Sequence, residues 1–235
     1  IDATHFSNCR GTATVENCRF EGMMDDALNV HSTCLGIVGR PAPDRIRCRY
    51  MHPQAIGFGV FAPGDDVRFI AGRTLENGFV GRVKAVETHD AREVTLTLAG
   101  PVPAEYGVGD AVENASWQCA VVFRNNTVAN NRARGVLFTT PKRIVCEDNF
   151  FDHVSGAAIL LAGDAQGWYE SGACEDLVIR RNRFRDCLTS VFQYCDALVS
   201  IHPEVKDLKA QRRRYHRNVV VEDNEIETFD VPLLY

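Results

Sequence analysis

The sequence predicts an all-β protein: a parallel β-helix with a small antiparallel β-barrel inserted between two of its coils. Two features of the 235-residue chain support this fold class. One short phrase recurs five times, and a long stretch between its first two copies has a different, alternating pattern. A helical fold is excluded because the apolar runs alternate and are too short to form one face of a helix.

The recurring phrase consists of a short β-branched strand, two polar residues, an Asn, one variable residue and an apolar residue. Its copies are TVENCRF, VFRNNTV, IVCEDNFF, VIRRNRF and VVEDNEI, with the recurrent position at Cys18, Asn126, Asn149, Asn182 and Asn224. Each coil of a β-helix buries one apolar stripe and stacks ~4.8 Å from the next coil. We expect the recurrent Asn to adopt a left-handed conformation and to form a hydrogen-bonded ladder along the stack.

A second short strand is expected about nine residues after each recurrent position. Its copies are ALNV (27–30), GVLF (135–138), AAILL (157–161) and SVFQY (190–194). The 23 residues from Asn126 to Asn149 define a bare coil. The next two intervals, of 33 and 42 residues, predict loops, which repeat proteins usually place on one face.

The first interval, from Cys18 to Asn126, is 108 residues and is too long for one coil. Its middle part alternates apolar and polar residues over several strands, separated by turns rich in Gly, Pro and Asn. We therefore expect β-helix coils over residues 1–40, an inserted β-barrel-like domain over 41–115, and further coils over 116–235.

Composition narrows the function classes. The net charge of -5 and the pI near 5.8 argue against a nucleic-acid-binding surface, which is normally basic. The basic run at residues 209–217 is predicted to be a solvated loop. No apolar run approaches the ~20 residues needed for a membrane span. Because the chain begins with Ile and shows no signal segment, we expect it to be part of a longer protein.

Nine cysteines are distributed along the chain without any CxxC pair. This distribution excludes zinc-ribbon and thioredoxin-type sites, and it does not resemble a small disulfide scaffold. Cysteine is also a small and readily buried residue. We expect most of the nine to be reduced residues of the core.

Two Asp-Asp pairs occur, and only the first has a context that suggests chemistry. Asp65 and Asp66 lie in a PGDD turn that opens a barrel strand, so this pair is predicted to be structural. Asp25 and Asp26 precede ALNV at a turn where later coils carry other residues, so the turn itself does not require them. Asp2 lies 23 residues before Asp25, one bare coil away, and should stack beside the pair.

Three carboxylates on one face of a β-helix repel one another, which raises at least one pKa. Such a set suits glycoside hydrolysis, in which one carboxylic acid protonates the leaving oxygen and a second carboxylate activates water or attacks the sugar. Clustered carboxylate oxygens also suit Ca²⁺, and a purely structural cluster is a third interpretation.

Residues 1–38 also show a resemblance to a known family. This segment resembles the catalytic segment of glycoside hydrolase family 110, the exo-acting α-1,3-galactosidases that include enzymes cleaving the blood-group B determinant. The matching residues are Asp2, Ala3, His5, Phe6, Asn8, Cys9, Gly11, Asp25, Asp26, Asn29, Val30 and His31. The resemblance implies a right-handed parallel β-helix with β-barrel elements, and a secreted, periplasmic or cell-surface protein.

The resemblance also implies an activity: removal of terminal α-1,3-linked galactose from a glycan, with inversion of configuration. Asp2 would be the general acid, and Asp25 and Asp26 would hold and deprotonate the attacking water. The acid and base carboxyls of inverting enzymes are about 6.5–9.5 Å apart. No metal or other cofactor is implied, and the expected partner is a glycan with terminal α-galactose.

Four further residues are candidates for substrate binding. Asn29 and His31 flank the Asp pair and could bind sugar hydroxyls, or they could be an ordinary strand Asn and turn His. Trp168 and Glu170 lie in a loop that the repeat does not require. A Trp face and a carboxylate commonly bind a sugar together, although Trp168 could instead hold the loop in place.

Two other functions remain open from the sequence. One is a non-catalytic, glycan-binding β-helix module, which would not need three clustered carboxylates. The other is a β-helix enzyme that degrades a polysaccharide with another specificity. A polysaccharide lyase would need a basic residue beside the acids, and neither Arg of residues 1–32 is adjacent to the Asp pair.

Overall fold

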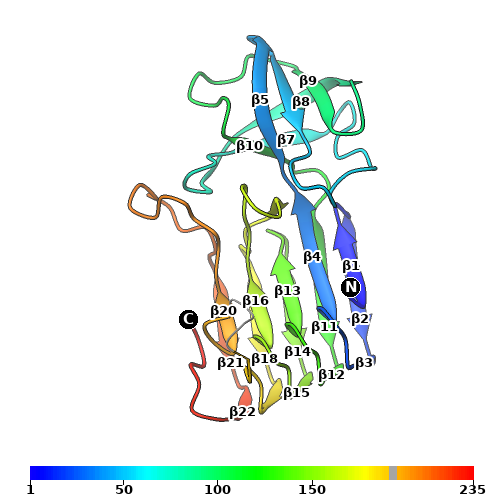
Figure 1. The fold of residues 1–235 in the computed structure, drawn as a ribbon, viewed down its shortest axis with the longest axis vertical. Helices are drawn as coiled ribbons and strands as arrows, with labels where there is room; N and C mark the ends of the chain where they lie inside the picture. The colour runs from blue at the N-terminus through cyan, green and yellow to red at the C-terminus, as the bar shows by residue number, and fades with distance from the viewer. Residues whose placement is uncertain (191–194) are drawn as a thin grey trace.

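The computed structural model describes residues 1–190 and 195–235 (Figure 1). The strands of these residues form three parallel sheets and one closed antiparallel barrel. The barrel lies at one end of an elongated stack of coils (Figure 1). Within the described part of the chain, no helix is long and apolar enough to cross a membrane.

Each coil contributes one strand to each parallel sheet. The first sheet, here called the site sheet, contains β1 (Thr4–Ser7), β4 (Leu28–Thr33), β13 (Val136–Thr139), β16 (Ile159–Leu161) and β20 (Val199–Ile201). The second contains β2 (Gly11–Glu16), β11 (Cys119–Arg124), β14 (Ile144–Glu147), β18 (Leu177–Arg180) and β21 (Val219–Glu222). The third contains β3 (Arg19–Glu21), β12 (Thr127–Ala129), β15 (Phe150–Asp152), β19 (Arg183–Arg185) and β22 (Glu225–Glu227). This topology confirms the predicted all-β fold of stacked parallel coils with an antiparallel barrel.

Three of the four predicted second strands coincide with strands of the site sheet. ALNV overlaps β4, GVLF overlaps β13 and AAILL overlaps β16. The fourth, SVFQY, falls on residues 191–194, which lie outside the described residues. The position beside β16 is occupied by β20, a few residues further along the chain.

The predicted ladder of recurrent Asn side chains is confirmed. The Oδ1 atoms of Asn149, Asn182 and Asn224 each accept a hydrogen bond from the backbone N–H of the recurrent residue one coil earlier, at 2.9–3.0 Å. Each Asn also donates through Nδ2 to a backbone carbonyl of the earlier coil, as Asn149 does to Phe123 O at 2.9 Å. The ladder therefore satisfies backbone groups at a buried corner between two sheets.

The left-handed residue lies one position before the ladder residue, so the sequence prediction was wrong by one residue. Positive φ angles occur at Asn17 (59°), Asn125 (53°), Asp148 (57°), Arg181 (53°) and Asp223 (52°). This preceding residue turns the chain, and the turn directs the next side chain inward to bond the neighbouring coils. Asn and Asp tolerate the left-handed conformation better than most residues.

Apolar side chains of the three sheets fill the interior of the coils. Phe20, Phe123, Phe151 and Phe184 stack along the axis, with successive ring centroids 5.1–6.4 Å apart. Stacked aromatic pairs stabilise a core beyond the area that they bury. Six of the cysteines are buried thiols outside any disulfide, as expected for reduced core residues: Cys34, Cys48, Cys119, Cys146, Cys174 and Cys187.

The closed barrel follows the site sheet without an intervening turn. It consists of β5 (Leu35–Ala42), β6 (Arg45–Arg49), β7 (Asp66–Ile70), β8 (Asn77–Thr88), β9 (Glu93–Leu98) and β10 (Ala111–Asn114). Only Cys34 separates β4 from β5. The first barrel strand therefore begins at Leu35, within residues 1–40 that were expected to form coils. The sequence did not reveal this boundary, because neither Gly nor Pro occurs at Cys34, where the chain passes from one sheet to the other.

The second Asp-Asp pair has a structural role, as predicted. The Asp65 carboxylate accepts hydrogen bonds from Asn114 Nδ2 at 2.8 Å and from Trp117 Nε1 at 3.2 Å. It thereby fixes the point where the chain returns from the barrel to the coils. Asp66 lies 3.1 Å from Arg82 in an ion pair on the barrel.

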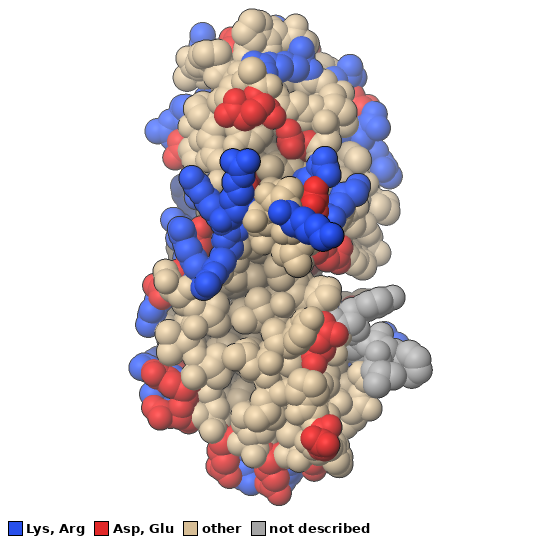
Figure 2. Space-filling view, turned by 90° about the vertical axis from the view of Figure 1, so that its left-hand side faces the viewer, with Lys and Arg blue, Asp and Glu red and all other residues tan. Residues whose placement is uncertain are grey.

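The basic segment 209–217 binds the barrel and is not simply a solvated loop. The backbone N–H groups of Arg212 and Arg213 both donate to Glu76 Oε1 at 2.6 Å. Tyr215 is buried in a small apolar cluster shared by the barrel and the coils. Lys and Arg side chains gather in a band between the barrel and the coils (Figure 2). The charged side chains stay at the surface while the backbone docks, which composition alone does not reveal.

We expect Asn149→Ala to lower the free energy of unfolding by about 2–4 kcal/mol, because it leaves several buried backbone groups without a partner. Urea unfolding at neutral pH measures this loss. Asn130→Gly is the matched control: Asn130 is an exposed corner residue with a φ of 55°, which Gly adopts freely. Equal losses in the two variants would contradict the structural role of the ladder.

Candidate active site

The candidate residues lie on the outer face of the site sheet and in the turns that precede its first strands. Side chains along β1 and β4 alternate between the core and this outer face. Phe6 and Val30 pack in the core. His5, Asn29 and His31, at the alternate positions, point outward from the sheet.

Asp2, Asp26 and Arg134 form a row across three successive coils. The register of β1 with β4, and of β4 with β13, places these three turn positions side by side. The backbone N–H of Asp26 donates to Asp2 Oδ1 at 3.3 Å. Asp2 therefore stacks on the Asp pair, as the coil period predicts, with Asp26 as its direct neighbour.

The row gathers three negative charges and one positive charge. One oxygen from each of Asp2, Asp25 and Asp26 lies within 4.8 Å of the others. Arg134 Nη2 donates to Asp26 Oδ2 at 2.9 Å and to Asp25 Oδ1 at 3.3 Å. Its Nε lies 2.8 Å from Asp26 Oδ1. The Asp26 side chain is 0% exposed, Asp2 is 12% exposed and Asp25 is 39% exposed.

Neighbouring carboxyls in this row favour different protonation states. Burial raises the pKa of Asp26 to about 7, against the opposing charge of Arg134. Burial also raises the pKa of Asp2, but the hydrogen bond and charge of His5 outweigh it, and the net shift is downward. Adjacent carboxyls whose pKa values are pushed apart are typical of acid–base sites.

His5, His31 and Glu170 form a second cluster that adjoins the first. His5 Nδ1 lies 2.7 Å from Asp2 Oδ2, and His5 Nε2 lies 2.6 Å from His31 Nε2. His31 Nε2 lies 3.5 Å from Glu170 Oε1. Burial lowers the pKa of His31 to about 4 and raises that of Glu170 to about 7. His5 therefore links the two clusters.

Glu170 reaches the site because its loop folds back along β4. The short strand β17 (Glu170–Ser171) pairs antiparallel with β4. The Asn29 side chain hydrogen-bonds Glu170, and Asn29 Oδ1 is buried without a partner among the described residues. Gly172 permits this approach: its φ is 117°, and an added Cβ would lie 2.2 Å from Thr139 O.

Asp164 fixes the loop that carries Trp168. Its carboxylate accepts backbone N–H hydrogen bonds from four residues, 166–169, at 2.7–3.0 Å. The Trp168 side chain is exposed, and its ring centroid lies 4.3 Å from that of His52 in the barrel. Trp168 therefore lies where the loop meets the barrel, two residues from Glu170.

The structure brings six of the seven predicted residues into these two adjoining clusters: Asp2, Asp25, Asp26, Asn29, His31 and Glu170. Trp168 lies at the edge, against the barrel. Sequence reasoning gave no role to Arg134, His5 or Asp164. A signal for Arg134 was present, because it occupies the turn position of Asp26 one coil later.

Two groups of described residues bring three possible metal ligands within 4.8 Å. In the group of Asp2, Asp25 and Asp26, the guanidinium of Arg134 already contacts two of the carboxylates. In the other group, the Nε2 atoms of His5 and His31 are 2.6 Å apart. That distance is shorter than the about 3.3 Å expected between two nitrogens bound to one tetrahedral zinc. The histidine pair therefore does not have the spacing of two zinc ligands, and the carboxylate group already faces a guanidinium.

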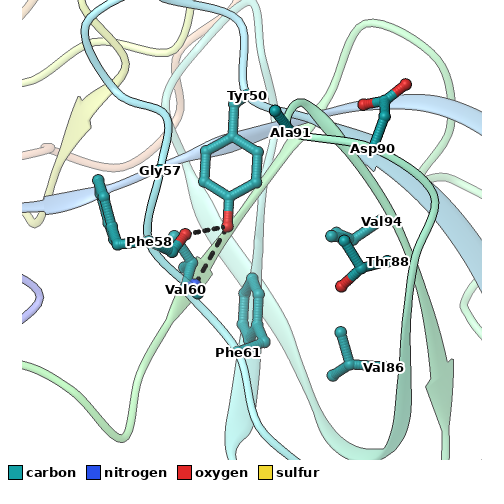
Figure 3. A pocket seen from close by; sticks show the side chains of 11 residues that line it. Tyr50, Gly57, Phe58, Val60, Phe61, Val86, Thr88, Asp90, Ala91 and Val94 are labelled. Atoms are coloured by element: carbon teal, nitrogen blue, oxygen red, sulfur yellow. Dashed lines mark hydrogen bonds between the residues drawn. The ribbon is translucent and has the colours of Figure 1, made fainter.

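A separate cavity of about 250 Å³ lies in the barrel (Figure 3). Its walls are mainly apolar and include Phe58, Phe61 and Val86. The Tyr50 hydroxyl donates to Phe58 O at 2.7 Å and accepts from the Val60 N–H at 3.2 Å. None of the candidate site residues lines this cavity, so it plays no part in the carboxylate chemistry.

We expect Arg134→Met to lower the free energy of unfolding by about 1–2 kcal/mol, because buried Asp26 loses its counter-charge and takes up a proton instead. Thermal and urea unfolding at pH 8 measure the loss, since most Asp26 is ionised there. The double variant with Asp26→Asn should recover much of it. If the double variant were as unstable as Arg134→Met alone, the ion pair would not be the cause.

Comparisons with known proteins agree with these features. A family model described as GLAA-B beta-barrel domain II matches residues 45–112, within the barrel. The chain is 58% identical over 234 residues to an alpha-1,3-galactosidase B of Akkermansia muciniphila, covering 100% of this chain and 30% of that protein. It is 47% identical over 247 residues to an alpha-1,3-galactosidase B of Bacteroides fragilis, covering 100% and 42%.

An alpha-1,3-galactosidase A of Bacteroides fragilis is 36% identical over 235 residues, covering 100% of this chain and 38% of that protein. The chain thus spans less than half the length of the curated relatives that it matches. Over its whole length, the chain is a homologue of one segment of proteins named alpha-1,3-galactosidase.

Proposed function

We propose that the protein containing this chain is a glycoside hydrolase that removes terminal α-1,3-linked galactose from glycans. The observation that carries the proposal is the convergence of Asp2, Asp25 and Asp26 on one face of the coils. The names of the homologous proteins support the substrate class. The proposed partner is a glycan with terminal α-galactose, and the proposed location is outside the cytoplasm or at the cell surface.

The proposed role of each carboxyl follows the family resemblance. Asp2 is the general acid, and Asp25 and Asp26 hold and deprotonate the attacking water. Asp25 is the most exposed of the three carboxyls and can contact that water. Asp26 is enclosed beside Arg134 and supports Asp25 from within the turn.

The neighbouring polar residues suit the binding of sugar hydroxyls. The Glu170 side chain is partly open, His31 beside it is nearly enclosed, and Asn29 Oδ1 has no partner among the described residues. A buried polar atom without a partner favours a ligand that supplies a hydrogen bond. Trp168, exposed at the edge of the site, offers an apolar face to a further part of the glycan.

The polysaccharide-lyase alternative receives less support. A lyase would need a basic group free to remove a proton. Lyases use an Arg or Lys as this base; Arg134 lies beside the acids, and its guanidinium is engaged by both Asp25 and Asp26. A pure glycan-binding module would not need carboxyls with opposed pKa shifts.

We expect Asp2→Asn, Asp25→Asn and Asp26→Asn each to lower kcat/KM by at least about 10²-fold. The assay is the release of galactose from an α-1,3-linked galactosyl disaccharide by the longest natural form of the protein. Asp66→Asn, in the structural Asp pair, is the matched control and should keep the native rate. Full activity in all three site variants would refute the proposed site, and no release by the native protein would refute the substrate.

We expect the first galactose released to be the β-anomer, the product of inversion at an α-linkage. The nearest carboxylate oxygens lie within 4.8 Å, closer than the about 6.5–9.5 Å separation of inverting pairs, so the resemblance carries this prediction and the spacing does not. Proton NMR during the first minutes of hydrolysis distinguishes the two anomers before they equilibrate. Initial release of the α-anomer would establish retention instead.

A further inference from the structure

A second pocket, of about 400 Å³, lies where the basic segment 209–217 meets the barrel. Its volume falls within the about 300–1,000 Å³ that is usual for ligand pockets. The pocket is separate from the candidate active site, because none of the candidate residues lines it. The residues that bear on its chemistry are Glu76, Phe79, Glu105, Tyr106, Arg212 and Arg213.

The basic side of the pocket is presented by an anchored backbone. The N–H groups of Arg212 and Arg213 donate to Glu76 Oε1 at 2.6 Å, and Gln211 Nε2 donates to Thr74 O at 3.0 Å. These bonds tie the segment to the barrel turn before β8. The two arginine side chains therefore extend from a fixed backbone, although they are exposed to solvent.

The guanidinium groups of Arg212 and Arg213 have no ion-pair or hydrogen-bond partner within the described part of the chain. By contrast, Arg217 of the same segment pairs with Glu175 at 2.7 Å. These arginines belong to the segment that lies between the barrel and the coils, where Lys and Arg side chains gather (Figure 2). A guanidinium without a protein partner favours an oxyanion, which it binds through two parallel hydrogen bonds.

Two carboxylates in the same pocket restrict which anion fits. Glu76 Oε1 is engaged by the backbone of the basic segment, whereas the exposed Glu105 has no partner among the described residues. A ligand with many negative charges, such as a nucleic acid, would bring some of them against these carboxylates. A ligand with one oxyanion and several hydroxyl groups matches both signs of charge, because a carboxylate accepts hydrogen bonds from hydroxyls.

An aromatic wall completes the pocket. The Phe79 side chain is 36% exposed, and its ring centroid lies 5.7 Å from that of Phe69 in the barrel core. The Tyr106 hydroxyl accepts the Phe79 N–H at 3.3 Å, and its own hydrogen has no acceptor in the described chain. An aromatic face beside a free hydrogen-bond donor suits the C–H face and the hydroxyls of a sugar ring.

We propose that this pocket binds a sugar residue that carries a single oxyanion, either a carboxylate or a sulfate ester. Arg212 and Arg213 bind the oxyanion, Glu105 and Tyr106 bind hydroxyl groups, and Phe79 covers the apolar face of the ring. The pocket thereby holds an acidic part of a glycan against the barrel. This inference goes beyond the proposed hydrolase activity and does not depend on it.

Saturation-transfer difference NMR on the longest natural form of the protein tests the ligand class with matched probes. Methyl glucuronide and methyl glucoside differ only in carrying a carboxylate or a hydroxymethyl group, and a glucose sulfate ester is the second acidic probe. Glucose derivatives avoid the proposed galactose site. At least one acidic probe should bind about tenfold more tightly than the glucoside, and the preferred probe identifies the oxyanion. Equal binding of all three probes, or binding of none, would overturn the proposal.

Substitutions in the pocket test its location. Arg212→Gln and Arg213→Gln should each weaken binding of the acidic probe by about fivefold or more, while their backbone bonds to Glu76 remain. Arg45→Gln is the matched control, because Arg45 is an exposed arginine of β6 without a side-chain partner among the described residues. Native affinity in both pocket variants would contradict the site. Tighter binding of a single-stranded oligonucleotide, lost in the same variants, would replace it with a general polyanion surface. Failure of galactose release would leave these results unchanged.

Discussion

Hydrogen bonding between successive coils in a fixed register is the constraint on which the rest of this structure depends. A slip of one residue would turn every side chain of a strand to the opposite face. The pairing of β1 with β4, and of β4 with β13, therefore determines which side chains become neighbours on the outer face. The Asn ladder strengthens this register, because each buried Asn binds backbone groups of the adjacent coil. The row of Asp2, Asp26 and Arg134 is a direct consequence of that stacking.

Once the row is formed, burial and charge give its members different properties. Three carboxylates close together in a partly enclosed place cannot all be ionised without compensation. Arg134 compensates Asp26 and Asp25, and His5 compensates Asp2. The carboxyls are therefore not equivalent: Asp2 has a lowered pKa, Asp26 is buried with a pKa of about 7, and Asp25 is the most open to solvent. Acid–base catalysis at a sugar requires such a difference between neighbouring groups.

The barrel completes the site from one end, although it supplies none of the carboxylates. β4 continues into β5, so the strand that carries Asn29 and His31 is anchored in both parts of the molecule. Asp164 holds its loop through four backbone hydrogen bonds, and Trp168 contacts His52 of the barrel. This loop places Glu170 beside β4, with which its short strand pairs. Its position depends on packing between parts of the chain that are distant in sequence.

The sequence by itself determined the coils, the inserted barrel, the Asn ladder and the stacking of Asp2 on the first Asp pair. It could do so because strands that pair in register require the same short strand and corner residue in every coil, which appear in the sequence as a recurring phrase. The tertiary structure decided the left-handed residue before each ladder Asn, the start of the barrel at Leu35, and the partnerships of Arg134 and His5. It also decided that the pKa of Asp26 is raised while that of Asp2 is lowered. Those properties depend on burial and on charges brought from other coils and loops, and no local pattern of residues records them.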